Sequence, residues 1–202
     1  MRHCFLSTVL LSTALLSQGP HAANQYVELP GSVVIKQQGK IQVLEFFSYG
    51  CGHCFDLETT IVPWIEQLPE DVDFNRVPAM FGGIWDAHGQ LFLTLQAMDV
   101  DYGVHNEVFQ AIRNRHRLAT PAQMADFLEL QGIDKYKFLA TYHSFAVQAR
   151  VMDAKQKIAA YNITGVPAMV VDGKYRFDLS AGGSNGILQL ADRLIVRGRT
   201  AH

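Results

Sequence analysis

Two cysteines, Cys51 and Cys54, are separated only by Gly52 and His53 in the stretch FFSYGCGHCFDLE. A pair at this spacing could form a structural disulfide, contribute half of a metal site, or act as a redox couple. It could also be a coincidence without chemical meaning. The other cysteines and histidines of the chain help to separate these possibilities.

The composition of the rest of the chain favours the redox couple. A disulfide that closes a two-residue gap constrains little of the unfolded chain, so it would stabilise the fold weakly. A structural zinc site needs four ligands, and the only other cysteine is Cys4, near the N-terminus. The spacing of paired zinc ligands is also missing from the histidines further along, among them His88, His105, His116 and His143. We therefore expect no metal and no other cofactor.

Residues 1–23 have the pattern of a secretory signal peptide. Arg2 and His3 precede an apolar stretch, 4–16, and small and polar residues follow it. The apolar stretch is shorter than the roughly 20 residues that span a bilayer, so a retained membrane anchor is the less favoured alternative. Cleavage would remove Cys4 and deliver the chain to an exported compartment, where protein disulfides form and persist.

The sequence around the cysteine pair predicts a strand followed directly by a helix. Ile41–Ser48 is apolar enough for a strand buried on both faces, and the stretch from about Gly52 to Gln67 has near-helical apolar spacing, with Pro63 predicting a kink. Cys51 would then lie at the helix N-terminus, where unpaired N–H groups and the helix dipole lower the pKa of a thiol. Cys54, one turn further on, should be more buried and less acidic.

This asymmetry predicts different roles for the two sulfurs. Cys51 would exchange disulfides with another protein, and Cys54 would resolve the mixed disulfide. His53 would place an N–H donor or a partial positive charge beside the sulfur; the alternative is an exposed polar residue in the first helical turn. Any stabilisation of the thiolate favours the reduced form and makes the disulfide a stronger oxidant.

Strands and helices follow one another in an order that indicates an α/β unit with an insertion. Strands are predicted at 26–29, 41–48, 72–77, 168–171 and 175–177, the last two joined by an Asp-Gly turn. Helices are predicted at 120–130 with Thr120 as N-cap, from Asp134, at 145–161 and at 184–196. Residues 24–80 and 145–202 would form the α/β unit, and 81–144 an inserted helical domain.

A second motif lies far from the cysteines, where Gly165, Val166 and Pro167 lead straight into the 168–171 strand. Proline is tolerated at the first residue of a strand. From these residues alone, the motif could also be an ordinary turn without a functional role. EFFSYGCGHC followed by TGVPAMVVDGKY, together with MFGG at 80–83 and SF at 144–145, resembles the exported, DsbA-like thiol:disulfide oxidoreductases of the thioredoxin superfamily.

The resemblance implies an α/β thioredoxin fold, in which helices flank a central mixed sheet, with an inserted all-helical domain. It also implies a cis Val166–Pro167 bond beside the cysteines, whose backbone binds an extended client peptide by strand addition. The implied activity is that of a periplasmic protein disulfide oxidoreductase, which donates the Cys51–Cys54 disulfide to newly exported proteins. A DsbB-like, quinone-linked membrane protein would reoxidise it, and we expect a monomer.

The chain departs from the family at Gly52, where many members carry proline, while Cys-Gly-His-Cys is the loop of the eukaryotic protein disulfide isomerases. The reduction potential and the balance between oxidase and isomerase therefore stay open. The alternatives are a periplasmic disulfide reductase or isomerase and, less favoured, a redox-inert chaperone-like binding module. A formal net charge of −2 with no block of like charges argues against nucleic acid as a partner.

Glu45 lies in the apolar sequence LEFF, where a carboxylate is costly unless it is paired or protonated. It could face outward on a half-exposed strand. The family resemblance instead supports a buried acid beneath Cys54 that relays a proton, with Arg76 on the next strand as a charge partner. A set of apolar side chains could frame a client surface or belong to the core: Phe47, Tyr49, Met80, Phe81, Ile84 and Trp85.

Overall fold

The computed structural model describes residues 25–30 and 39–200. The signal peptide predicted at 1–23 lies outside these residues. Within them, no helix is both long enough and apolar enough to cross a membrane.

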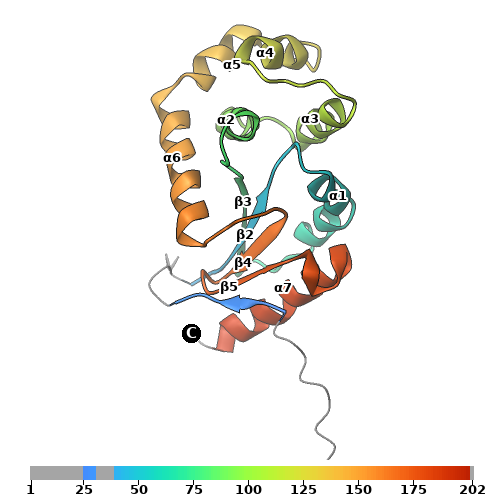
Figure 1. Ribbon diagram of the computed structural model, residues 1–202, viewed down its shortest axis with the longest axis vertical. Helices are drawn as coiled ribbons and strands as arrows, with labels where there is room; N and C mark the ends of the chain where they lie inside the picture. The colour runs from blue at the N-terminus through green and yellow to red at the C-terminus, as the bar shows by residue number, and fades with distance from the viewer. Residues whose placement is uncertain (1–24, 31–38, 201–202) are drawn as a thin grey trace, which may run out of the picture.

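A mixed five-stranded sheet forms the centre of the α/β part (Figure 1). Its strands are β1 (Val27–Glu28), β2 (Ile41–Phe47), β3 (Val72–Pro78), β4 (Ala168–Val171) and β5 (Tyr175–Asp178), in the spatial order β1-β5-β4-β2-β3. β2 and β3 are parallel, whereas β2–β4, β4–β5 and β1–β5 are antiparallel. Strand β2 lies inside the sheet, between β4 and β3, and is buried along nearly its whole length, as its continuous apolar sequence predicts.

Helices cover both faces of the sheet. On one face lie α1 (Gly52–Ile65) and α7 (Gly183–Thr200), preceded by the short 3-10 helix η1 (Leu179–Ala181). Val43 and Met169 of the sheet share a core with α1 and α7, while Leu44 and Phe46 face a second core on the opposite side. This arrangement confirms the predicted thioredoxin fold with helices around a mixed sheet.

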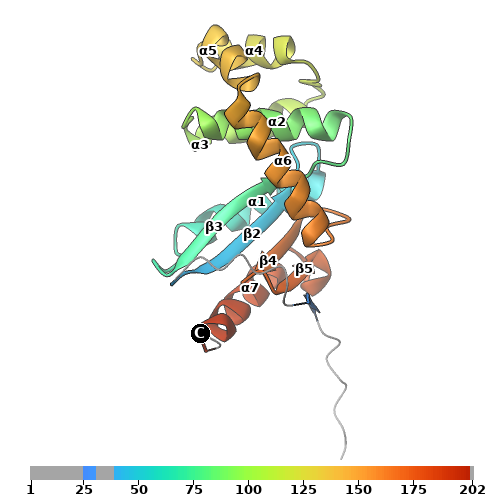
Figure 2. The same ribbon diagram turned by 90° about the vertical axis from the view of Figure 1, so that its left-hand side faces the viewer.

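A block of helices lies between β3 and the long helix α6 (Phe145–Ala160) in the chain and occupies one end of the molecule (Figures 1 and 2). The block consists of α2 (Ile84–Ala97), α3 (Tyr102–Arg113), α4 (Pro121–Glu129) and α5 (Lys135–Tyr142). Helix α6 runs from this block down along the sheet and packs against both α2 and β3. The exact limits of an inserted domain at 81 and 144 stay a prediction.

The starts of α4 and α5 are those that the sequence predicts. Thr120 accepts a hydrogen bond from the Gln123 backbone N–H, and the Gln123 side chain accepts one from the backbone N–H of Ala119. Asp134 caps α5 by accepting from the N–H of Lys137. Helix α1 forms a single run that ends at Ile65, with Pro63 in its last turn.

The β4–β5 hairpin contains the turn that the sequence predicts. Asp172 and Gly173 have φ values of 54° and 62°, and the Lys174 N–H donates to the Val171 carbonyl at 3.0 Å, which confirms the predicted turn.

The pairing of β4 with β2 places the second motif beside the first. Phe46 of β2 pairs with Ala168 of β4. The turn that precedes β4 therefore lies at the end of β2 from which α1 begins.

The six apolar residues that could have framed a client surface divide into two groups. Phe47, Tyr49 and Met80 are buried, because α2 and α3 cover the end of β2, so a surface role is wrong for these three. Phe81 and Ile84 are exposed, and Trp85 is half-buried. An aromatic cluster seals the junction between the sheet and the block: Phe47, Tyr49, Phe92, His105 and Phe109.

Truncation of Phe109 should measure how strongly this junction stabilises the fold. Phe109 is fully buried, so Phe109→Ala is expected to lower the free energy of unfolding by about 3–5 kcal/mol. Phe145, also a helical phenylalanine, is 89% exposed, so Phe145→Ala should change it by no more than about 0.5 kcal/mol. Chemical denaturation followed by circular dichroism gives both values. Equal effects of the two variants would contradict this packing.

Candidate active site

Helix α1 begins at the cysteine pair. Cys51 is its N-cap residue, and its Sγ accepts a hydrogen bond from the Cys54 backbone N–H at 3.1 Å. The Cys51 thiol also lies 3.5 Å from the carbonyl oxygen of Val166, to which it donates. Both cysteines are free thiols, so the site is described in its dithiol form.

The two thiols have opposite pKa shifts. A hydrogen bond from the Cys54 thiol, together with backbone N–H groups of Cys54 and His53, lowers the pKa of Cys51 to about 7 against the opposing effect of burial. Burial, followed by the proximity of Cys51, raises the pKa of Cys54 well above its ordinary value. Cys51 is therefore ionised in part at neutral pH, while Cys54 holds its proton.

The two residues between the cysteines, Gly52 and His53, have different surroundings. The His53 side chain is exposed and lines a groove of about 450 Å³ next to the Val166–Pro167 turn. Gly52 is not among the residues with positive φ, and a Cβ there would lie 3.4 Å from Nη1 of Arg113, the end of a flexible side chain. The backbone conformation therefore does not require glycine at position 52.

The turn before β4 meets the cysteine pair, although it is more than a hundred residues away in sequence. The Val166–Pro167 peptide bond is cis, as the family resemblance implied. Val166 is half-buried and Pro167 is buried, and both line the groove that His53 borders. The structure thus brings Cys51, His53, Val166 and Pro167 to one surface.

Glu45 is fully buried, so an outward-facing position on a half-exposed strand is wrong. Its register partner on β3 is Arg76, whose Nε donates to Glu45 Oε2 at 2.8 Å. The other carboxylate oxygen, Oε1, has no hydrogen-bond partner among the described residues. Burial raises the pKa of Glu45 to about 7, although the positive charge of Arg76 acts in the opposite direction.

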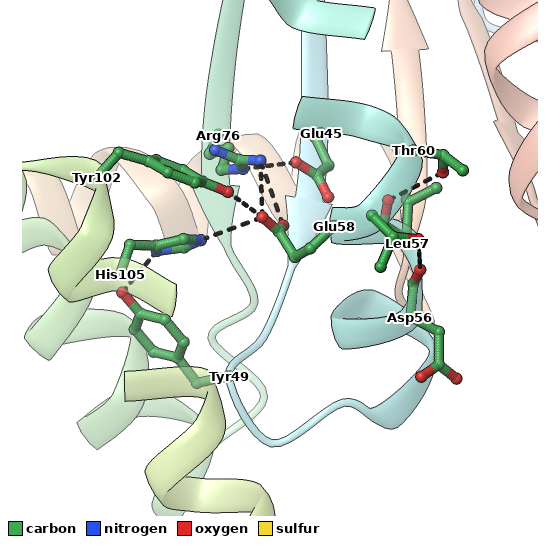
Figure 3. A network of polar contacts seen from close by, with 10 residues as sticks. Glu45, Tyr49, Asp56, Leu57, Glu58, Thr60, Arg76, Tyr102 and His105 are labelled. Atoms are coloured by element: carbon green, nitrogen blue, oxygen red, sulfur yellow. Dashed lines mark hydrogen bonds and ion pairs between the residues drawn. The ribbon is translucent and has the colours of Figure 1, made fainter. Parts of the chain in front are cut away.

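A polar network that the sequence did not reveal surrounds this pair (Figure 3). Nη2 of Arg76 donates to both carboxylate oxygens of Glu58, at 3.2 and 3.3 Å. The hydroxyl of Tyr102 donates to Glu58, and Nε2 of His105 lies near the same carboxylate. Glu58 follows Cys54 by four residues, so helical spacing could have placed it near Glu45. No local sequence pattern indicates that Tyr102 and His105 belong to this network, because they lie on α3 in the inserted block.

Comparisons with known proteins cover the whole chain. Residues 62–194 match the family model of the DSBA-like thioredoxin domain, a segment that begins just after the cysteine pair. A Pseudomonas aeruginosa protein named thiol:disulfide interchange protein DsbA is 52% identical and is aligned over 100% of this chain and 99% of its own length. A protein of the same name from Azotobacter vinelandii is 51% identical over 100% of both chains.

Solved structures show the same similarity in three dimensions. The crystal structure of Pseudomonas aeruginosa DsbA has a TM-score of 0.85 and 57% identity, and the alignment covers 88% of this chain and 93% of that one. The oxidoreductase DsbA from Xylella fastidiosa has a TM-score of 0.81 at 29% identity, with 87% and 96% covered. The arrangement of the sheet and the helical block is therefore shared with structures of quite different sequence.

Replacement of Cys54 should reveal how much its thiol acidifies Cys51. Because that thiol is the largest cause of the lowered pKa of Cys51, Cys54→Ala is expected to raise the pKa from about 7 towards the ordinary value of 9.0. Cys54→Ser keeps an O–H donor at the same position, so its pKa should stay nearer 7. The rate of alkylation by iodoacetamide as a function of pH, measured on reduced protein, gives each midpoint. Identical midpoints in the two variants would exclude the side-chain hydrogen bond as the cause.

Proposed function

We propose that this protein, a thiol:disulfide oxidoreductase that belongs to the DSBA-like thioredoxin domain family, donates a disulfide between Cys51 and Cys54 to exported proteins. One observation carries the assignment of the pair. The acidic sulfur of Cys51 caps helix α1 and lies 3.5 Å from the Val166 carbonyl, at the edge of a groove. A client sulfur that reaches this groove would meet Cys51 first, because Cys54 is fully buried.

The exchange begins when a client thiolate attacks the Cys51 sulfur of the oxidised pair. The Cys51–Cys54 bond breaks, Cys54 leaves and takes up a proton, and the client is joined to Cys51 as a mixed disulfide. A second client thiolate then attacks the client sulfur and displaces Cys51 as a thiolate. The client loses two electrons and gains a disulfide, while the enzyme becomes a dithiol. The lowered pKa of Cys51 makes it a good leaving group in this last step.

The groove beside the cis peptide is suited to an extended client segment. Residues 162–168 and 176–179 line this groove, together with His53. An extended peptide that pairs with the backbone at Val166 would be held mainly by main-chain hydrogen bonds, which tolerate many sequences. Such broad recognition suits a protein that oxidises many different clients.

Glu45 acts on Cys54 during reoxidation of the dithiol. The Cys54 sulfur attacks Cys51 in a mixed disulfide, the bond between Cys51 and its partner breaks, and the proton of Cys54 passes to Glu45. Both side chains are fully buried, and the charge of Glu45 is one of the causes that raise the pKa of Cys54. A buried base whose pKa is about 7 can accept a proton and later return it under neutral conditions.

The partners and the compartment follow from this chemistry. Each cycle leaves Cys51 and Cys54 reduced, so an oxidant must restore the disulfide, and we assign that role to a DsbB-like, quinone-linked membrane protein. Residues 1–23 would direct the chain to the periplasm, where reduced clients arrive after export. The protein would act there as a monomer.

A disulfide reductase or isomerase is the second candidate, and the limited extent to which the pKa of Cys51 is lowered favours it. A thiol with a pKa of about 7 stabilises the dithiol form less than a strongly acidic thiol would, so the disulfide is a weaker oxidant. The equilibrium of the Cys51–Cys54 couple against glutathione separates the two candidates. A strongly oxidising couple supports the oxidase, and a thioredoxin-like value supports the reductase.

Oxidation of a reduced client peptide tests the proposed activity. Pre-oxidised protein is expected to convert a two-cysteine peptide to its disulfide, one peptide per enzyme disulfide, while Cys51→Ala is inactive. Acid quenching and peptide mapping should find the client attached to Cys51. Failure of the pre-oxidised wild-type protein to oxidise the peptide would support a redox-inert binding module instead. Activity that survives in Cys51→Ala would exclude the Cys51–Cys54 disulfide as the oxidant, and a client found on Cys54 would reverse the two roles.

The proton transfer to Glu45 is tested by the pH dependence of the resolving step. Glu45 accepts a proton only when it is ionised, so release of glutathione from a Cys51–glutathione mixed disulfide should accelerate as the pH rises through about 7. In Glu45→Gln the acceleration is expected only at higher pH, where Cys54 ionises by itself. Stopped-flow measurement of glutathione release gives both profiles. Glu66 is an exposed carboxylate at the end of the same α1 helix, so Glu66→Gln should keep the wild-type profile. An unchanged profile in Glu45→Gln would disprove the relay.

A further inference from the structure

One guanidinium serves two carboxylates next to the cysteine pair. Arg76 donates to Glu45 through Nε and to Glu58 through Nη2. The Glu45 side chain is fully buried, and those of Arg76 and Glu58 are about 9% and 10% exposed. If both carboxylates were ionised, one negative charge in the interior would be uncompensated. The environment must therefore favour the charge on one carboxylate and the proton on the other.

The additional partners are all on Glu58. The Tyr102 hydroxyl donates to Glu58 Oε2, and Nε2 of His105 lies 3.8 Å from the same oxygen. The Tyr102 ring also contacts Arg76, whose Cζ lies 5.1 Å from the ring centroid. Among the described residues, Glu45 in contrast has only the bond from Arg76, on one of its oxygens. Figure 3 shows Tyr102 and His105 approaching Glu58 from the side opposite Glu45.

His105 is held in a fixed orientation. Its Nδ1 is 2.7 Å from the Tyr49 hydroxyl, and the rings of Phe92 and Phe109 pack against the imidazole. Burial lowers the pKa of His105, which favours the neutral ring. When the Tyr49 hydroxyl donates to Nδ1, the ring proton resides on Nε2 and faces Glu58. At 3.8 Å this N–H contributes a favourable dipole rather than a full hydrogen bond.

We propose that Tyr102 and His105 are positioning residues, which hold the Glu58 carboxylate against Arg76 so that Glu58 neutralises the guanidinium and Glu45, rather than Glu58, is the acid that takes up and releases a proton beside Cys54. The helical block would thereby control an acid inside the α/β unit. This inference rests on the proposed function of Glu45 as the group that exchanges a proton with Cys54.

The charges that surround Glu45 are consistent with this arrangement. Arg76 faces it from β3 and Glu58 from α1, and the sulfurs of the cysteine pair lie at the start of α1, while its partner on β4 is the uncharged Met169. Burial would raise the pKa of Glu58, but His105 and the charge of Arg76 outweigh burial and hold it below its usual value. Glu58 is in turn one of the causes that raise the pKa of Glu45.

A cavity of about 250 Å³ lies beside the three side chains that contact Glu58. Tyr102, His105 and Arg76 line this cavity, and Tyr102 is 40% exposed. Without the Tyr102 hydroxyl, the Glu58 carboxylate would be free to turn into this space and become hydrated. Arg76 would then pair more fully with Glu45, whose ionised form would be stabilised.

The titration of Glu45 in the reduced full-length protein tests the proposal directly. ¹³C NMR of labelled glutamate carboxyl carbons gives its midpoint, with the Glu45 signal assigned by its loss in Glu45→Gln. Glu58→Gln should lower the midpoint from about 7 by about 1 unit, because a nearby negative charge is removed. Tyr102→Phe should lower it by a smaller amount. His105→Gln should lower it as well, and it serves as a second variant if Tyr102→Phe fails to fold.

A double variant decides whether Tyr102 acts through Glu58. In a Glu58→Gln background, Tyr102→Phe is expected to cause no further shift. Tyr142→Phe, at a buried tyrosine of the same helical block but outside this network, should leave the midpoint unchanged. The proposal is overturned if Tyr102→Phe and His105→Gln leave the midpoint at its wild-type value, or if the Tyr102→Phe shift persists in the double variant. Because NMR reads the carboxyl group itself, this result is independent of whether the protein oxidises clients.

Discussion

The chemistry of this protein depends on one constraint: strand β2 is buried on both faces, and a short segment of four residues, 48–51, leads directly from it to helix α1. The packed strand fixes the first turn of the helix in space, so the unpaired N–H groups at the helix start point at one sulfur. The hydrogen bond from the Cys54 thiol and these N–H groups together lower the pKa of Cys51, and Cys54 is carried into the core. The same strand aligns β4, and through β4 it brings the Val166–Pro167 turn against Cys51.

The burial that positions the sulfurs also creates an electrostatic cost. A carboxylate in the middle of β2 can be charged only with a partner, and the parallel register supplies Arg76. The arginine is shared with Glu58, however, so the local charge balances when only one of the two acids is ionised. A site built in this way keeps a titratable proton close to a thiol that cannot ionise easily by itself.

What could be predicted from the sequence is what depends on neighbouring residues. The helix start at Cys51, the caps at Thr120 and Asp134 and the Asp-Gly hairpin are local features, and each is present. Burial of Glu45 depends on α1 lying above β2, so local sequence left it open. Phe47 and Tyr49 belong to the core because α2 and α3, remote in sequence, cover them. Contacts of that range require the fold itself.

The helical block therefore contributes more than a cover for the sheet. Its α3 helix supplies Phe109, which packs with Phe92 of α2 over the end of β2, and the hydroxyl and imidazole that contact Glu58. Arg113, at the end of the same helix, lies over the ring of Phe55 in α1 and next to Gly52. A single helix of the insertion thus reaches both the acid behind the cysteines and the loop between them. If this helix controls Glu45 as proposed, changes in the block would tune the redox pair while the thioredoxin unit and its two sulfurs stay the same.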